Sequence, residues 1–198
     1  MALLTDTLRS GTRTHHERIE QRLGLPHSVT SQSAYRELLI GFYGFYLPVE
    51  PRLLEKLSTL SELRMSERQK LDLLRQDLTA LGLDDQAIEA LPRCSHIPPL
   101  GSVPQARRCL DLLEGSTLGG QVISAHFTRM LEITAKTGGR FYQGYGSATA
   151  SYWRAFKEAA NAYSARYPEQ DSLVVESACS TFELLEIWLC SARQVQQG

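Results

Sequence analysis

Hydrophobic residues recur every three or four positions along almost the whole chain, which is the spacing of amphipathic α-helices. The first such stretch places Leu4, Leu8, Ile19 and Leu23 on one stripe, and a Gly24–Pro26 stop follows it. Nowhere in the sequence do apolar and polar residues alternate with the two-residue period of a half-buried strand. The pattern therefore predicts an all-α protein.

The second and third helical segments are separated by breaks. Ser33 is placed to cap the second segment, and Pro48 and Pro51 should kink or break it because proline lacks a backbone N–H. The third segment is expected to begin at Ser66 and to end at Gly82.

The second half of the chain begins after a proline-rich connection over residues 92–104. A long helix is expected from about Gln105 to Thr137, with Gly138–Gly139 as its C-terminal stop. Ser147 is placed to cap the next helix, and Asp171 to open the last one.

Length and composition fit one domain. The chain has 198 residues, of which 42% are hydrophobic and 22% charged, as in ordinary globular proteins. We expect a single all-α domain of six to eight helices over residues 1–198. The formal net charge of −1 provides no overall attraction to nucleic acid or to a membrane.

The cellular compartment is expected to be the cytoplasm. The first residues carry no basic leader followed by an apolar run, and no stretch has 18 uninterrupted apolar residues, so no membrane span is expected. The four cysteines show no CxxC spacing and are expected to be reduced thiols.

A histidine on the first helix is a candidate metal ligand. Arg9 and His16 are seven positions apart, so they share a helix face and lie roughly 10 Å apart along the axis. Glu20 is four positions after His16 and can accept the second imidazole N–H, which would fix the orientation of a ligating ring. An ordinary His–Glu pair on a half-exposed helix face explains the same spacing, and His15 lies closer to the apolar stripe.

Three glycines interrupt the pattern of the long helix. Gly115, Gly119 and Gly120 cost roughly 1 kcal/mol each relative to alanine, and Gly115 and Gly119 leave one face bare for over a turn. Such a face lets main chain lie against a flat ligand, with Ser116 and Thr117 adding hydroxyls. It also suits a close contact between two helices.

Together, these two segments resemble heme oxygenases. Residues 8–20, Leu-Arg-Ser-Gly-Thr-Arg-Thr-His-His-Glu-Arg-Ile-Glu, are similar to the helix that carries the proximal histidine in that family. Residues 113–122, Leu-Glu-Gly-Ser-Thr-Leu-Gly-Gly-Gln-Val, resemble the distal helix, and Gly-Ser-x-Leu-Gly looks like the bacterial branch, including the bacteriophytochrome-associated type. The resemblance is one of motifs over these two helices and is weak elsewhere, while the length, the helical pattern and the order of the two motifs also agree.

The resemblance implies a role for several residues. His16 matches the proximal iron ligand, and Glu20 its hydrogen-bond partner. Gly115 and Gly119 match the distal glycines, with Ser116 between them where mammalian-type members have an aspartate. The residues that match basic contacts to the heme propionates are Arg9, Arg154 and Lys157.

Two departures from the family pattern concern the distal pocket. Ser116 in place of an aspartate requires a different distal water network. An aromatic residue common just before the glycine motif is absent, because Asp111 and Leu112 occupy that stretch.

The activity implied by the resemblance is oxidative opening of heme b to biliverdin, carbon monoxide and ferrous iron, with heme as both cofactor and substrate. The reaction uses O2 and electrons from an external donor such as ferredoxin or a flavin reductase, since the chain has no flavin, nicotinamide or iron–sulfur motif. A bacteriophytochrome is a possible acceptor of the bilin.

Other functions remain open at this point. A non-catalytic heme carrier or sensor would keep His16 and add a second strong ligand, for which His126 is the candidate. A thiaminase-like helical enzyme would need a paired carboxylate or reactive cysteine, and no such constellation stands out. A di-iron bundle is disfavoured because the chain has no Glu-x-x-His.

Overall fold

The computed structural model describes the backbone of residues 4–195 and the side chains of residues 10–117, 119–170 and 178–191. Within these residues every regular element is a helix and no strand is present, which confirms the all-α prediction. The α-helices are α1 (Leu4–Leu23), α2 (Gln32–Leu57), α3 (Leu71–Ala80), α4 (Asp85–Glu89), α5 (Val103–Leu131), α6 (Arg140–Gln143), α7 (Thr149–Arg166) and α8 (Asp171–Val195). Four short 3-10 helices join them, at Ser61–Leu63, Met65–Glu67, Gly146–Ala148 and Pro168–Gln170.

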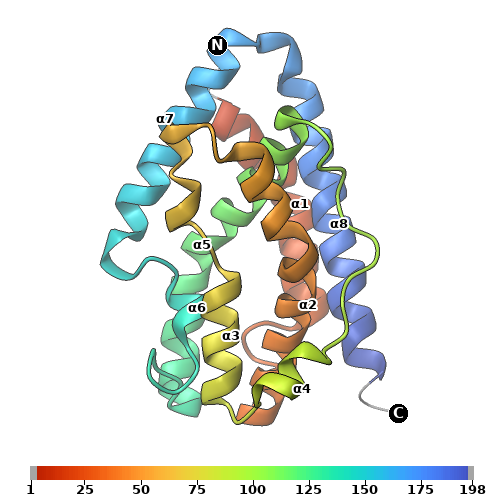
Figure 1. Cartoon of the computed structure of the whole chain (residues 1–198), viewed down its shortest axis with the longest axis vertical. Coiled ribbons are helices and arrows are strands. Elements are labelled where there is room, and N and C mark those ends of the chain that lie inside the picture. Colours follow the sequence, from red (N-terminus) through yellow and green to blue (C-terminus); the bar gives the residue numbers. More distant parts are fainter. Residues whose placement is uncertain (1–3, 196–198) are drawn as a thin grey trace.

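The long helices form an elongated bundle around one hydrophobic core. In Figure 1, α7 and α8 lie on opposite flanks, with α2, α3 and α5 between them. α1 packs against α8 and α7, while α5 contacts α2, α6, α7 and α8. Fully buried side chains at the centre include Tyr35, Phe45, Phe127 and Phe156.

α2 continues through both prolines, so the helix is not broken at Pro48 or Pro51. Proline at position 48 leaves the Gly44 carbonyl without its usual partner four residues later. The Cys94 N–H, from the segment after α4, donates to that carbonyl at 2.9 Å. A hydrogen bond from a distant segment thus replaces the one that the proline removes.

Several helix ends differ from those expected. Ser31, not Ser33, caps α2, because its hydroxyl accepts the Ala34 N–H at 3.1 Å. α3 begins at Leu71 rather than at Ser66, since two 3-10 turns occupy the preceding residues. α7 begins at Thr149 after Ala148, without a side-chain cap, so Ser147 is not its cap.

The end of α5 was also placed too late. The helix stops at Leu131, where Glu132 takes a left-handed conformation with φ 57°, and residues 132–139 form a loop before α6. Gly138 and Gly139 lie in this loop, and the buried Tyr35 hydroxyl donates to the Gly138 carbonyl at 2.9 Å. The two glycines therefore shape the loop and do not end α5.

A buried carboxylate fixes α1 against α8. Glu186 on α8 is almost fully buried, and Arg18 Nε and Arg22 Nη1 on α1 each donate to it at 2.7 Å. A buried carboxylate needs such partners because it has lost its hydration. The result is a defined position for the helix that carries His16.

A second buried carboxylate holds α6. Asp77 on α3 accepts the backbone N–H groups of Arg140 at 2.9 Å and Phe141 at 2.7 Å. These are N–H groups of the first turn of α6, which have no partner within the helix. Asp77 therefore positions the short helix that contributes Phe141 and Tyr142 to the site described below.

None of the described helices has both the length and the hydropathy that a membrane span requires.

Gly44 sits at the closest approach between α2, α8 and the segment after α4. A Cβ added there would collide with the Pro92 carbonyl oxygen and lie 2.7 Å from Trp188 Cζ2. We expect Gly44→Ala to lower the free energy of unfolding by about 1–3 kcal/mol through overpacking. Chemical denaturation measures the effect.

Gly101→Ala is the matched control for this prediction. A Cβ at Gly101 meets only Gln105 Oε1, at an ordinary 3.5 Å. Its effect should stay within about 0.5 kcal/mol. Equal effects of the two substitutions would contradict the packing described for Gly44.

Candidate functional site

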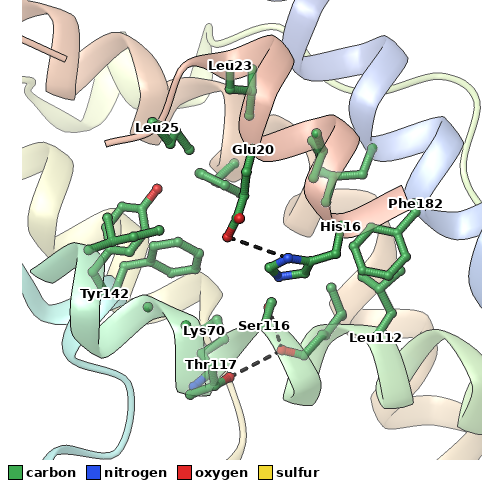
Figure 2. Close-up of a pocket in the computed structure, with 18 of the residues that line it drawn as sticks. His16, Glu20, Leu23, Leu25, Lys70, Leu112, Ser116, Thr117, Tyr142 and Phe182 are labelled. Atoms are coloured by element: carbon green, nitrogen blue, oxygen red, sulfur yellow. Dashed lines mark hydrogen bonds and ion pairs between the residues drawn. The ribbon is translucent and has the colours of Figure 1, made fainter. Parts of the chain in front are cut away.

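A cavity of about 830 Å³, including its open mouth, lies between α1 and α5 and reaches α2, α6 and α8. Figure 2 shows His16 and Glu20 of α1 on one side, Ser116 and Thr117 of α5 opposite, and Tyr142 and Phe182 at the two ends. Its lining is mostly apolar: Ile19, Leu23, Leu25, Phe42, Tyr46, Leu112, Leu113, Ile123, Phe141, Tyr142, Phe182 and Leu185.

The His16 imidazole lies on the α1 wall of the cavity. Its Nδ1 is 3.4 Å from Glu20 Oε1, and both side chains are partly exposed. The ring packs edge-on against Phe182 of α8, with centroids 5.8 Å apart. Because Nδ1 faces the carboxylate (Figure 2), Nε2 is the nitrogen left for a ligand.

The other two candidate histidines do not line the cavity. His15 faces α8, where its Nε2 lies 3.3 Å from Glu183 Oε1. His126 stacks edge-on against His27, with ring centroids 5.0 Å apart. The structure therefore brings neither of them opposite His16.

The glycines of α5 serve two different purposes. A Cβ at Gly115 or Gly119 would meet nothing within 4 Å, so the face they share is open rather than packed against a helix. Gly119 lines the cavity, whereas Gly115 is not among the lining residues. A Cβ at Gly120 would lie 3.2 Å from the Tyr142 carbonyl oxygen, so Gly120 is the glycine that allows close packing, here against α6.

The two hydroxyls between the glycines are bonded to their own helix. Ser116 Oγ donates to the Leu113 carbonyl at 2.8 Å, and Thr117 Oγ1 donates to the same carbonyl at 3.2 Å. Both residues line the cavity, and α5 remains one continuous helix through them. Their oxygens can still accept hydrogen bonds from a ligand or water.

Aromatic rings close the end of the cavity opposite Phe182. Phe42 packs against Phe141 with centroids 5.1 Å apart, and Tyr46 contacts Phe141 at 5.7 Å. Tyr142 joins this group through Phe141 at 5.2 Å. Such flat apolar walls suit a large planar ligand.

Lys70, just before α3, lines the cavity and was not singled out in the sequence. Its side chain is buried, and its Nζ lies 3.6 Å from the centroid of the Tyr145 ring. Burial lowers the pKa of this amine to about 8, opposed by the charges of Glu114 and Glu50. A single lysine between a polar and an apolar neighbour matches no sequence motif, so only the folded structure shows that Lys70 belongs to the site.

Two of the three basic residues expected at the propionates do not line the cavity. Arg154 is exposed on α7, Lys157 is half-buried on the same helix, and neither lines the site. Arg9 lies on the part of α1 whose side chains are outside the described residues. All three stay predictions.

The geometry defines a class of site: an imidazole on one helix faces, across an apolar cavity, a stretch of another helix where two hydroxyl side chains adjoin glycines. An apolar lining with one imidazole suits a flat apolar ligand with a metal at its centre. The imidazole offers a nitrogen ligand, and Gly119 on the opposite wall lets main chain approach the cavity. The lining residues therefore fit heme.

Comparison with solved structures shows the same fold in bacterial heme oxygenases. The heme oxygenase of Neisseria meningitidis, described with NO and CO bound, has a TM-score of 0.81 at 20% identity, covering 97% of this chain and 92% of that one. The Leptospira interrogans enzyme gives 0.72 at 18% identity, with coverage of 96% and 100%. Heme oxygenase-1 from the cyanobacterium Synechocystis, in complex with heme, gives 0.67 at 17%, with coverage of 95% and 91%.

The family follows from the sequence match. The heme oxygenase family model matches residues 2–190, so the chain belongs to the heme oxygenase family. Comparison with curated proteins gives no match.

The open face of α5 predicts an unusual gain in stability. In the heme-free protein, Gly119→Ala should raise the free energy of unfolding by about 0.5–1 kcal/mol, because alanine favours the helix and the added methyl meets no atom. Gly120→Ala should gain less, since its methyl presses on the Tyr142 carbonyl. Denaturant unfolding of both variants tests this, and equal gains would contradict the distinction.

The lowered pKa of Lys70 predicts a pH dependence of stability. The folded protein releases the Lys70 proton near pH 8, whereas the unfolded chain holds it until about pH 10.5. Because the unfolded state binds more protons between these values, heme-free wild type should gain stability relative to Lys70→Met as pH rises from 8 to 10.5. The free energy of unfolding of both proteins is measured by denaturation at several pH values. If the difference between wild type and Lys70→Met is the same at pH 8 and at pH 10.5, the pKa of Lys70 is not lowered by burial.

Proposed function

We propose that this protein is a heme oxygenase in activity as well as in family, and that it opens heme b to biliverdin, carbon monoxide and ferrous iron. The observation that carries the proposal is the His16 imidazole facing the Gly119 stretch of α5 across one apolar cavity. That arrangement matches what the sequence resemblance assigns to the proximal and distal sides. The relatives named above support the same assignment.

In this proposal His16 would hold the heme iron through Nε2, and Glu20, whose carboxylate lies 3.4 Å from Nδ1, keeps the ring oriented. The apolar side chains of α1, α2, α5 and α8 bind the macrocycle and exclude water from it. Bound heme would supply both the substrate and the iron centre that activates oxygen. Arg9, Arg154 and Lys157 are proposed to meet the carboxylates at the ligand edge.

The distal side is proposed to act through its shape. With no side chain at Gly115 and Gly119, the α5 main chain can lie close to the plane of the ligand. Main chain at that distance would restrict the space for a small molecule beside the macrocycle. Ser116 offers an oxygen in the same space, where an ordered water can be bound.

The remaining participants come from outside the chain. The electrons are proposed to come from a donor such as ferredoxin or a flavin reductase, and O2 is the oxidant. A bacteriophytochrome is a proposed acceptor of the bilin product. We expect the protein to work in the cytoplasm.

Heme titration of His16→Ala and His15→Ala tests the proposal. Wild type and His15→Ala should bind heme through one histidine and, with O2 and a reductant, lose the Soret band while bilin and carbon monoxide form. His16→Ala should lose the histidine-ligated spectrum and at least about tenfold in heme affinity. His15 is the matched control because it neighbours His16 but faces Glu183 of α8.

Two outcomes would overturn the proposal. Heme that binds and stays intact in the presence of O2 and reductant would leave only a carrier. A ferric spectrum with two histidine ligands would favour a sensor or carrier, although His126 packs on His27 away from the cavity.

A further inference from the structure

Lys70 is a buried cation to which the described residues offer no hydrogen-bond acceptor. Only 4% of the residue is exposed, and no described group forms a hydrogen bond with its Nζ. The side chain nevertheless lines the cavity, on the α5 side and close to Thr117 (Figure 2). An ammonium group carries three N–H donors, and burying them without acceptors is costly.

The backbone around Lys70 is held firmly. Its N–H donates to Glu50 Oε2 at 2.5 Å, and the Leu71 N–H donates to Glu50 Oε1 at 3.2 Å. The side chain then crosses the face of Tyr145, at 3.6 Å from Nζ to the ring centroid. The position of the ammonium group is therefore determined before any ligand enters.

The two carboxylates whose charges act on Lys70 form hydrogen bonds with other groups. Glu114 accepts from the buried Arg68 guanidinium and, at 2.5 Å, from the Tyr145 hydroxyl. Glu50 accepts the two backbone N–H groups described above. Both carboxylates help to keep the amine protonated, yet neither forms a hydrogen bond with it.

Unlike Lys70, the neighbouring hydroxyl donors on α5 already have acceptors. The Ser116 and Thr117 hydroxyls donate to the Leu113 carbonyl, whereas the Lys70 donors have no acceptor. On this side of the cavity Lys70 is thus a positive charge held in position, and its N–H groups are available to a ligand. On the α1 side the Glu20 carboxylate lies 3.4 Å from His16, so that side offers an anion a like charge.

We propose that Lys70 is the anion-binding residue of this cavity, and that it stabilises a small anionic ligand held between bound heme and α5. The inference rests on the proposed binding of heme to His16. An anion gains both Coulomb energy and a charge-assisted hydrogen bond in this sheltered position. A neutral ligand of the same size gains neither.

Azide is the anionic probe and carbon monoxide the neutral one. Azide binding to the ferric heme complex and carbon monoxide binding to the reduced complex are titrated by absorption, for wild type and Lys70→Met. The substitution should weaken azide binding about tenfold, the loss of a charge-assisted hydrogen bond. Carbon monoxide affinity should change less than about twofold, because that ligand is uncharged.

Lys136→Met is the matched control, since it removes one positive charge from the exposed loop after α5. It should leave both affinities as in wild type. If Lys136→Met weakens azide binding as much as Lys70→Met does, the effect is one of net charge and the proposal is overturned. The same holds if azide and carbon monoxide lose affinity equally, which would indicate a distorted cavity.

A crystal structure of the wild-type azide complex covers the case in which Lys70→Met does not fold. Lys70 Nζ should lie within about 3.2 Å of an azide nitrogen. A separation with no hydrogen bond would overturn the role of Lys70 while leaving heme binding intact. A chain that takes up no heme would overturn this inference together with the proposed function, so the two failures are distinguishable.

Discussion

The site depends on α1 being held at a distance from α5. Glycines on a helix usually let a neighbouring helix approach, yet here a Cβ at Gly115 or Gly119 would meet nothing within 4 Å. α1 is drawn instead onto α8, where Arg18 and Arg22 share the buried Glu186 carboxylate. Removing one partner would leave an uncompensated buried charge, so this contact is costly to break. The cavity stays open because the helix that could fill it is anchored elsewhere.

A cluster of polar residues around Glu114 of α5 places one positive charge, Lys70, beside the cavity. Arg68, Glu114 and Tyr145 form a buried hydrogen-bonded network around the residue that precedes Gly115. Tyr145 stacks on Tyr152 with ring centroids 4.3 Å apart, and its other face meets the Lys70 ammonium. A satisfied network of this kind specifies one arrangement of the elements that contribute to it. The unsatisfied member, Lys70, is the one that lines the cavity.

Sequence patterns predicted the elements better than their ends. The spacing of apolar residues correctly indicated helices throughout, and the Asp171 start of α8 and the Gly24 stop of α1 agree with the structure. A kink or break of α2 was expected at Pro48 and Pro51, because the rule for proline considers only the local hydrogen bond. The Gly44 carbonyl, which loses its partner at Pro48, accepts a hydrogen bond from the Cys94 N–H instead. Cys94 lies far from α2 in the sequence, so no local pattern could predict this bond.

By itself, the sequence determined the helical class, the pairing of His16 with Glu20 and the bare face at Gly115 and Gly119. These are properties of residues three or four positions apart, which the helix brings together without help from the rest of the chain. Only the tertiary structure decided that the bare face is open, that Gly120 packs on α6, and that Lys70 joins the cavity. The physical reason is that burial and cavity shape arise from contacts between segments far apart in the chain, which set where each helix stands relative to the others.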